Sequence, residues 1–169
     1  MQQKLSVFQT NISNLNGRLI EACELAISTQ ETLKYRDGTV QTQGHLRDVI
    51  VEDNSLVEVH TLYSVIGDAI KAFRPDKKID QLWLFANRSP KSIESNVFHD
   101  HPGYDIAGCY YVQVPLGSGG NLEFTEPSLT IHPEEGMLVL FEADYWHRVT
   151  DVSSEDLYRY SIAFNCKFA

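Results

Sequence analysis

The sequence predicts an α+β fold with N-terminal helices followed by a barrel of short strands. Up to about residue 78, apolar residues recur every three or four positions in two segments, which is the period of a helix face. Beyond residue 78, short apolar or alternating segments are separated by Gly, Pro, Asp and Ser, as in strands joined by turns. Because such a series of short strands is typical of jelly-roll and cupin-like architectures, we expect residues 79–169 to form this barrel.

Two helices are predicted in the first part of the chain. The first covers about residues 12–27, with Asn11 or Ser13 as its cap, and a polar surface connection follows over residues 29–48. The second covers about residues 56–73 and ends before Pro75, because proline cannot continue the helical hydrogen bonds. We therefore expect residues 1–78 to be helix-rich within a single domain of residues 1–169.

Eight strands are predicted in the second part of the chain. They cover Gln81–Asn87, Asn96–His101, Ile106–Pro115, Gly120–Thr125, Leu129–Ile131, Met137–Glu142, His147–Thr150 and Tyr158–Phe164. Six aromatic residues of this part of the chain are expected to pack in the barrel core, namely Tyr110, Tyr111, Tyr145, Trp146, Tyr158 and Tyr160.

The composition limits the classes of protein to consider. The 169 residues include 43% hydrophobic residues, enough for the core of one globular domain. The net charge of -9 and the lack of a basic patch argue against nucleic acid as a partner. No apolar segment is long enough to span a membrane, and the first residues lack the apolar stretch of a signal peptide. Three widely spaced cysteines fit reduced thiols, so we expect a cytoplasmic location.

Two histidines separated by one residue suggest a metal site. In an extended segment, side chains alternate between the two faces, so His99 and His101 point the same way and Asp100 points the other way. His147 follows the apolar strand Met137–Glu142 and, across a barrel, could complete a set of three ligands. Imidazole suits Fe, Zn, Cu or Ni, and three protein ligands leave coordination positions open for substrates. The alternative is that the histidine pair belongs to a polar outer surface.

The remaining histidines are interpreted as structural or solvated. His45 and His60 lie in the helical part, and His132 lies in a turn before Pro133. None of the three is included in the predicted metal site.

The last predicted strand carries a candidate binding site for a carboxylate. Arg159 and Ser161 share one face of this strand, and the arginine fork matches two carboxylate oxygens. A tyrosine hydroxyl near the metal could also bind a carboxylate, and Tyr111 is the candidate. The alternative for Arg159 is a surface arginine that faces solvent.

Four segments in this order resemble the iron(II)- and 2-oxoglutarate-dependent oxygenase superfamily, within it a group of small oxygenases often found in phages and marine bacteria. The segments are FHDHPGYDIAGCYYVQVP, GSGGNLEF, HPEEGMLVLFEADYWHRV and RYSIAFN, which lie between Val97 and Asn165. The step of 12 residues from His147 to Arg159 is also the one expected for the 2-oxoglutarate arginine of that superfamily. The resemblance implies a double-stranded β-helix fold, a jelly-roll or cupin-like barrel, with the N-terminal helices bracing its outer sheet.

The resemblance also implies roles for individual residues. His99 would be the first metal ligand and His147 the distal ligand, while Arg159 and Ser161 would bind the distal carboxylate of 2-oxoglutarate. The chain departs from the family pattern at His101, where a carboxylate is usual. Two acidic residues, Asp100 and Asp105, are minor candidates for the metal, the former if the strand turns and the latter if the Pro102–Gly103 loop folds back.

The leading functional hypothesis is a dioxygenase that uses Fe(II), 2-oxoglutarate and O2 to hydroxylate a second substrate. The primary substrate could be a protein side chain, a nucleobase, a metabolite or a glycan, with an extended nucleic acid least favoured, and the sequence does not fix the oligomeric state. Loops over residues 36–44 and 87–96 are expected to contact the substrate. Two alternatives are a three-histidine, cupin-like dioxygenase that needs no oxoacid and a non-catalytic barrel that serves as a binding module.

Overall fold

The computed structural model of the protein describes residues 3–29, 43–46, 57–89, 97–153 and 157–169. Its helices are η1 (Ser13–Leu15, a 3-10 helix), α1 (Asn16–Thr29) and α3 (Val57–Phe73). Its strands are β1 (Leu5–Gln9), β2 (Gln43–His45), β3 (Ile79–Ser89), β4 (Ile106–Gln113), β5 (Leu122–Phe124), β6 (Leu129–Ile131), β7 (Met137–Glu142), β8 (His147–Val149) and β9 (Arg159–Phe168).

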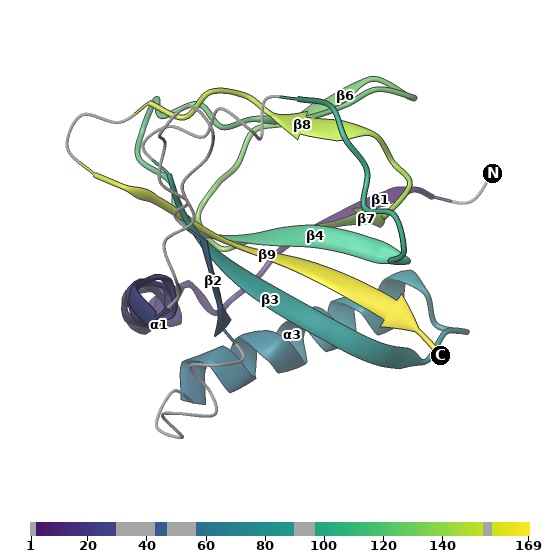
Figure 1. Ribbon diagram of the computed structural model, residues 1–169, viewed down its shortest axis with the longest axis horizontal. Coiled ribbons are helices and arrows are strands. Elements are labelled where there is room, and N and C mark those ends of the chain that lie inside the picture. Colours follow the sequence, from purple (N-terminus) through teal and green to yellow (C-terminus); the bar gives the residue numbers. More distant parts are fainter. Residues whose placement is uncertain (1–2, 30–42, 47–56, 90–96, 154–156) are drawn as a thin grey trace.

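The strands form two antiparallel sheets that face each other (Figure 1). The large sheet has the order β1-β7-β4-β9-β3-β2, and the small sheet has the order β6-β5-β8. Helices α1 and α3 cover one face of the large sheet, and the small sheet lies over the other face. The predicted α+β fold, a β-barrel braced by N-terminal helices, is therefore confirmed.

The alternation of side chains in the large sheet creates two separate cores. On β4, Tyr110 packs among the helices, whereas the next residue, Tyr111, packs between the two sheets. On β9, Ile162 and Phe164 likewise belong to the helix-side core. The residues that alternate with them, including Ser161, consequently face the interior between the sheets. This interior is the space in which a ligand site can form.

The two predicted helices are present, but the predicted cap of the first is wrong. The residue that precedes η1 is Ile12, and it makes no capping hydrogen bond through its side chain. The polar anchor at the start of α1 is Asn16, whose amide donates to the Val112 carbonyl at 2.8 Å and accepts from the Tyr110 hydroxyl at 2.7 Å.

Within the described ranges, no helix is long and apolar enough to cross a membrane.

Besides shifts at strand ends, such as that of β9, which continues to Phe168 instead of ending at Phe164, the strands differ from the prediction in three segments. Strand β1 was not predicted, although all five of its residues pair with β7. Strand β2 interrupts the predicted surface connection, and Leu46 directly after it is fully buried. In the described part of the predicted strand Asn96–His101, the extended pairing is reduced to one bridge between His99 and His147.

Two of the aromatic residues assigned to the core are exposed. Trp146 is 51% exposed and Tyr158 is 46% exposed, whereas Tyr110, Tyr111, Tyr145 and Tyr160 are buried. Trp146 lies between two residues that face the interior, so its own side chain faces outward. Tyr158 immediately precedes β9, where the alternation of the strand no longer fixes its direction.

Gly108 on β4 provides a test of the packing between the sheet and the helices. A Cβ atom at this position would overlap the Phe164 ring and the backbone oxygen of Val139. We therefore expect Gly108→Ala to lower the free energy of unfolding by about 3 kcal/mol, as measured by denaturant titration. In the matched control, Gly67→Ala, the new Cβ meets nothing within 4 Å on α3, and we expect about 1 kcal/mol of stabilisation. Equal effects of the two substitutions would contradict this packing account.

Candidate metal centre

A short antiparallel pairing brings the distant histidines together. The backbone N–H of His99 donates to the carbonyl of His147 at 2.9 Å, and the N–H of His147 donates back to His99 at 3.0 Å. The N–H of His101 donates to the Ala143 carbonyl at 2.9 Å. Residues 99–101 thus lie beside the turn that leads into β8.

The three imidazoles form a cluster inside the barrel. One ring nitrogen from each of His99, His101 and His147 lies within 4.8 Å of the others. The ring centroids of His99 and His147 are 4.5 Å apart, and those of His101 and His147 are 5.0 Å apart. The expected alternation therefore places His99 and His101 on the same side, toward His147.

Backbone hydrogen bonds orient two of the rings. The Nδ1 atom of His99 lies 2.8 Å from the Val97 carbonyl, and that of His147 lies 2.8 Å from the Tyr145 carbonyl. Because a carbonyl oxygen only accepts, each Nδ1 carries the proton and each Nε2 carries a lone pair, and Nε2 of His147 lies 3.2 Å from Nε2 of His101. A ring whose other nitrogen donates to a carbonyl is the usual arrangement of a metal-binding histidine. The cluster therefore fits a metal ion.

Burial keeps two of these rings neutral at physiological pH. Desolvation lowers the pKa of His101 to about 4, and the charge of His99 lowers it in the same direction. Desolvation likewise lowers the pKa of His147 to about 4, although its hydrogen bond with Tyr145 opposes the shift. Because only neutral imidazole binds a metal, the low pKa values favour ligation down to moderately acidic pH.

The same shifts predict how the metal-free protein responds to pH. The pKa of an unfolded histidine is about 6.5, so between pH 6.5 and 4 the unfolded chain binds more protons than the native state. Stability should therefore fall as the pH drops through this window. We expect the thermal midpoint to fall more steeply in the wild type than in the double variant His101→Gln/His147→Gln. Parallel pH profiles of the two proteins would contradict this expectation.

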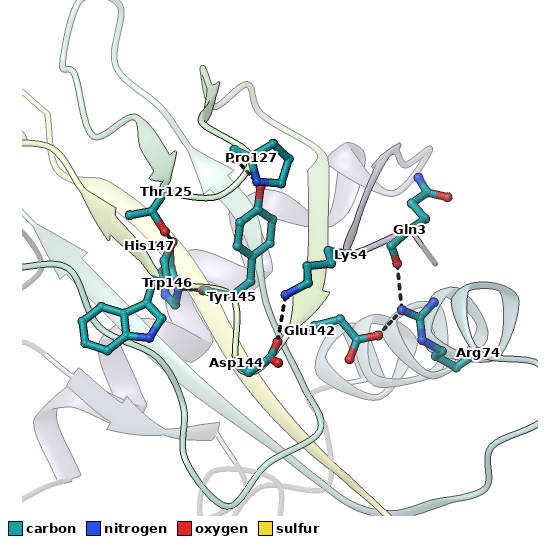
Figure 2. Close-up of polar contacts among 10 residues, drawn as sticks. All are labelled: Gln3, Lys4, Arg74, Thr125, Pro127, Glu142, Asp144, Tyr145, Trp146 and His147. Atoms are coloured by element: carbon teal, nitrogen blue, oxygen red, sulfur yellow. Dashed lines mark hydrogen bonds and ion pairs between the residues drawn. The ribbon is translucent and has the colours of Figure 1, made fainter. Parts of the chain in front are cut away.

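The turn before His147 is held by contacts with the N-terminal segment and the end of α3 (Figure 2). Arg74, directly after α3, pairs with Glu142 and donates to the Gln3 carbonyl. Lys4 pairs with Asp144 at 3.7 Å. These contacts fix the end of β7, from which the chain turns toward His147.

Aromatic rings line the inner side of the cluster. The Phe141 ring lies 4.5 Å from the His147 ring, and Phe124 lies 5.8 Å from it. Tyr145 packs against Phe124 at 4.5 Å, and its hydroxyl donates to the Pro127 carbonyl (Figure 2). This apolar wall excludes water from one side of the cluster and supports the rings in place.

Arg159 lies in the same interior and is 5% exposed. Its Nη2 donates to the Gly120 carbonyl at 3.3 Å, and its guanidinium lies 5.2 Å from the centre of the Tyr111 ring. Its buried Nε has no hydrogen-bond partner, and no carboxylate within the described ranges forms a salt bridge with it. The burial rules out the alternative of a surface arginine that faces solvent. A buried guanidinium without a carboxylate partner favours an anionic ligand.

The other predicted carboxylate-binding residues lie beside Arg159. Ser161 is buried and pairs with Tyr111 across β4 and β9. The Tyr111 hydroxyl contacts the side chains of Arg159 and Cys109, and desolvation raises the pKa of this hydroxyl. Tyr111 therefore stays protonated and can donate a hydrogen bond to an anion.

The other candidate residues lie outside the histidine cluster. Asp100 is half-buried and is not a member of the cluster. Asp105 is exposed, and its Oδ2 accepts a hydrogen bond from the Phe168 N–H at 2.8 Å. His60 and His132 are exposed, and His45 lies at the end of strand β2 and not in a helix. Of the loops predicted to contact the substrate, residues 36–42 and 90–96 lie outside the described residues.

Three supporting residues were not identified from the sequence. A Cβ atom at Gly120 would lie 3.0 Å from Nε of Arg159, so only glycine allows the close approach of this loop to the guanidinium. Arg74 and Lys4 hold the turn before His147, and both lie far from it in the sequence. The motif GSGG around Gly120 was a usable signal, whereas the two ion pairs left no local pattern.

Comparisons with known proteins found a family match over part of the chain. A family model described as "Putative 2OG-Fe(II) oxygenase" matches residues 120–165, which include His147 and Arg159. No match was found among curated proteins.

Solved structures share the fold at low sequence identity. A prolyl 4-hydroxylase from Phytophthora capsici superposes with a TM-score of 0.69 and 16% identity over 99% of this chain. A prolyl-4-hydroxylase from Pseudomonas putida gives a TM-score of 0.62 and 14% identity, covering 97% of this chain and 92% of that one. A Trichoplax adhaerens prolyl hydroxylase gives 0.65 and 13%, covering 97% of this chain and 83% of that one. This chain spans 60% of the Phytophthora chain.

These findings confirm the resemblance and the fold class that the sequence predicted. The fold is the double-stranded β-helix of the oxygenases, and the matching family consists of enzymes that use Fe(II) and 2-oxoglutarate. The predicted enzyme class and cofactors agree with that family.

Proposed function

We propose that the protein is an Fe(II)- and 2-oxoglutarate-dependent oxygenase with His99, His101 and His147 as its metal ligands. The observation that carries the proposal is the cluster of ring nitrogens within 4.8 Å of one another, two of them oriented through their Nδ1 atoms. Imidazole is a common ligand of iron, and three protein ligands leave positions open for cosubstrate and O2.

The proposed 2-oxoglutarate site is formed by Arg159, Ser161 and Tyr111. The free Nε of Arg159 and the protonated Tyr111 hydroxyl supply donors for the distal carboxylate. Charge-assisted hydrogen bonds of this kind are roughly twice as strong as neutral ones. The backbone of Gly120 packs closely against the guanidinium of Arg159 and holds it in place before the cosubstrate binds.

When bound, Fe(II) supplies the activation of O2 that couples oxidation of 2-oxoglutarate to oxidation of a second substrate. The protein's own residues hold the ion, anchor the cosubstrate and exclude water. Phe141 and Phe124 form the dry wall beside His147. Because three neutral histidines bring no negative charge, the dianionic cosubstrate would itself neutralise the metal.

A three-histidine dioxygenase without an oxoacid is the second candidate. The neutral ligand set favours it, because the carboxylate usual in the family is replaced by His101. The buried Arg159 favours the first candidate, because it otherwise lacks an anionic partner in the described residues.

One experiment separates these candidates. The purified protein is loaded with Fe(II) and supplied with 2-oxoglutarate and O2, and formation of succinate is followed by NMR. Succinate production, abolished by a chelator, is the expected result. Consumption of O2 without succinate, together with no binding of 2-oxoglutarate to the Zn(II)-loaded protein, would favour the second candidate. Failure to bind Fe(II) would contradict both candidates and favour a non-catalytic barrel.

We further propose a cytoplasmic location. The support comes from the free thiols of Cys23, Cys109 and Cys166, since reduced cysteines are typical of that compartment.

A further inference from the structure

We propose that Asn165 positions the primary substrate and that this substrate presents a neutral amide, as a segment of peptide does. The inference rests on the proposed oxygenase function and extends it to the class of substrate. It is based on a buried amide oxygen without a partner, on the row of the sheet in which Asn165 lies, and on the neutral aromatic pair beside it.

Strand pairing in the large sheet places Asn165 in the same row across the strands as Phe141, which contacts the histidine cluster. On β9, Asn165 alternates with Phe164 and Cys166 of the helix-side core, so it faces the barrel interior. It pairs with Ala107 on β4, and Ala107 pairs with Phe141 on β7. Phe141 is the ring that contacts His147. Asn165 and Phe141 are thus two strands apart, roughly 10 Å across the sheet.

Asn165 lies far along β9 from Arg159, the proposed anchor of the cosubstrate. Six residues separate it from Arg159 along β9, which corresponds to roughly 20 Å of extended strand. Ser161 and Ala163 lie between them on the same face. A ligand in contact with Asn165 is therefore distinct from the distal carboxylate held by Arg159.

The amide oxygen of Asn165 has an unmet requirement for a hydrogen bond. Its Oδ1 is buried, and it has no hydrogen-bond partner among the described residues. A buried polar atom without a partner costs about 1–3 kcal/mol. A ligand that donates to this oxygen would recover that cost, which makes Asn165 a favourable contact for a substrate.

The residues around Asn165 favour a neutral substrate. Trp83 pairs directly with Asn165 across β3 and β9, and the Trp83 ring meets Tyr104 edge-on with centroids 5.4 Å apart. Both aromatic side chains are half-buried, and neither carries a charge. The Asn165 amide can both donate and accept, which matches the donor and acceptor of a peptide bond. The net charge of -9 disfavours an anionic polymer in the same place.

Tryptophan fluorescence can test this proposal directly. The chain has two tryptophans, so Trp146→Phe leaves Trp83, next to Asn165, as the only reporter. The Zn(II)-loaded protein with 2-oxoglutarate is titrated with pools of N-acetylated, C-terminally amidated tripeptides, each pool with one fixed uncharged central residue. We expect at least one pool to change the Trp83 emission in a saturable manner. The same pools with free C-terminal carboxylates should bind at least tenfold more weakly.

The substitution Asn165→Leu keeps the volume of the side chain and removes its hydrogen bonds. It should weaken the binding of the responding pool about tenfold and leave 2-oxoglutarate affinity within twofold. Asn11→Leu, the same change at an exposed site before η1, should alter neither affinity. The proposal is overturned if no amidated pool binds, if nucleosides or free carboxylates bind more tightly, or if Asn165→Leu binds as well as the wild type. Loss of 2-oxoglutarate binding in the wild type would instead refute the proposed function.

Discussion

Replacing Arg159 with alanine is expected to weaken the binding of 2-oxoglutarate by about a hundredfold while leaving metal affinity within about twofold. The guanidinium is buried and has a free Nε, so a bound carboxylate would form charge-assisted hydrogen bonds with it. Loss of such bonds costs about 1.5–3 kcal/mol, or roughly ten- to a hundredfold in affinity. Isothermal titration of the Zn(II)-loaded protein with 2-oxoglutarate measures the effect.

Arg159→Lys is the matched variant for this experiment. Lysine keeps the charge but lacks the planar fork, so we expect an intermediate loss of about tenfold. Thermal unfolding of each variant checks that the barrel still forms around Gly120 and Tyr111, which contact the guanidinium. An equal loss of metal and oxoacid affinity in Arg159→Ala would mean that Arg159 is a structural residue and would contradict its assignment to the cosubstrate.

Replacing His147 with alanine is expected to lower the affinity for Fe(II) by at least a hundredfold. His147 lies in the middle of the proposed ligand set, with ring centroids 4.5 Å from His99 and 5.0 Å from His101. Its removal leaves two ligands, and even the loss of an outer hydrogen bond to a metal ligand usually costs ten- to a hundredfold. Equilibrium dialysis against a series of Fe(II) concentrations, carried out without oxygen, measures this affinity.

His60→Ala is the control for non-specific binding by histidine. His60 is exposed on α3 and is not a member of the cluster, so its removal should leave Fe(II) affinity unchanged. If His147→Ala bound Fe(II) as tightly as His60→Ala, the metal would lie elsewhere. That result would contradict the proposed centre.

The local sequence pattern was sufficient to predict most strands of the barrel and the shared direction of the His99 and His101 side chains. Strands β6 and β7 have the predicted boundaries, because turn residues flank each short apolar segment. The relation between His99 and His101 followed from the alternation of an extended chain, which needs no knowledge of the fold. The pairing of His99 with His147 across 48 residues depends on the fold, and the sequence indicated it only on the assumption of a barrel and through the family resemblance.

The features that were not predicted from the sequence depend on residues that lie far away in the chain. Strand β1 has only five residues, and its pairing with β7 is set by a neighbour more than a hundred residues away. Arg159 could not be assigned to the interior from its own strand, because alternation does not tell which face is inside. Asn165 was passed over for the same reason, since its unpaired oxygen exists only in the assembled barrel.

The most direct test of the proposed centre is anomalous scattering at the iron edge from crystals grown without oxygen in the presence of Fe(II) and 2-oxoglutarate. We expect one iron peak bounded by Nε2 of His99, His101 and His147, with the oxoacid extending from it to Arg159. An iron peak away from these three nitrogens, or no peak in the barrel, would contradict the proposed centre.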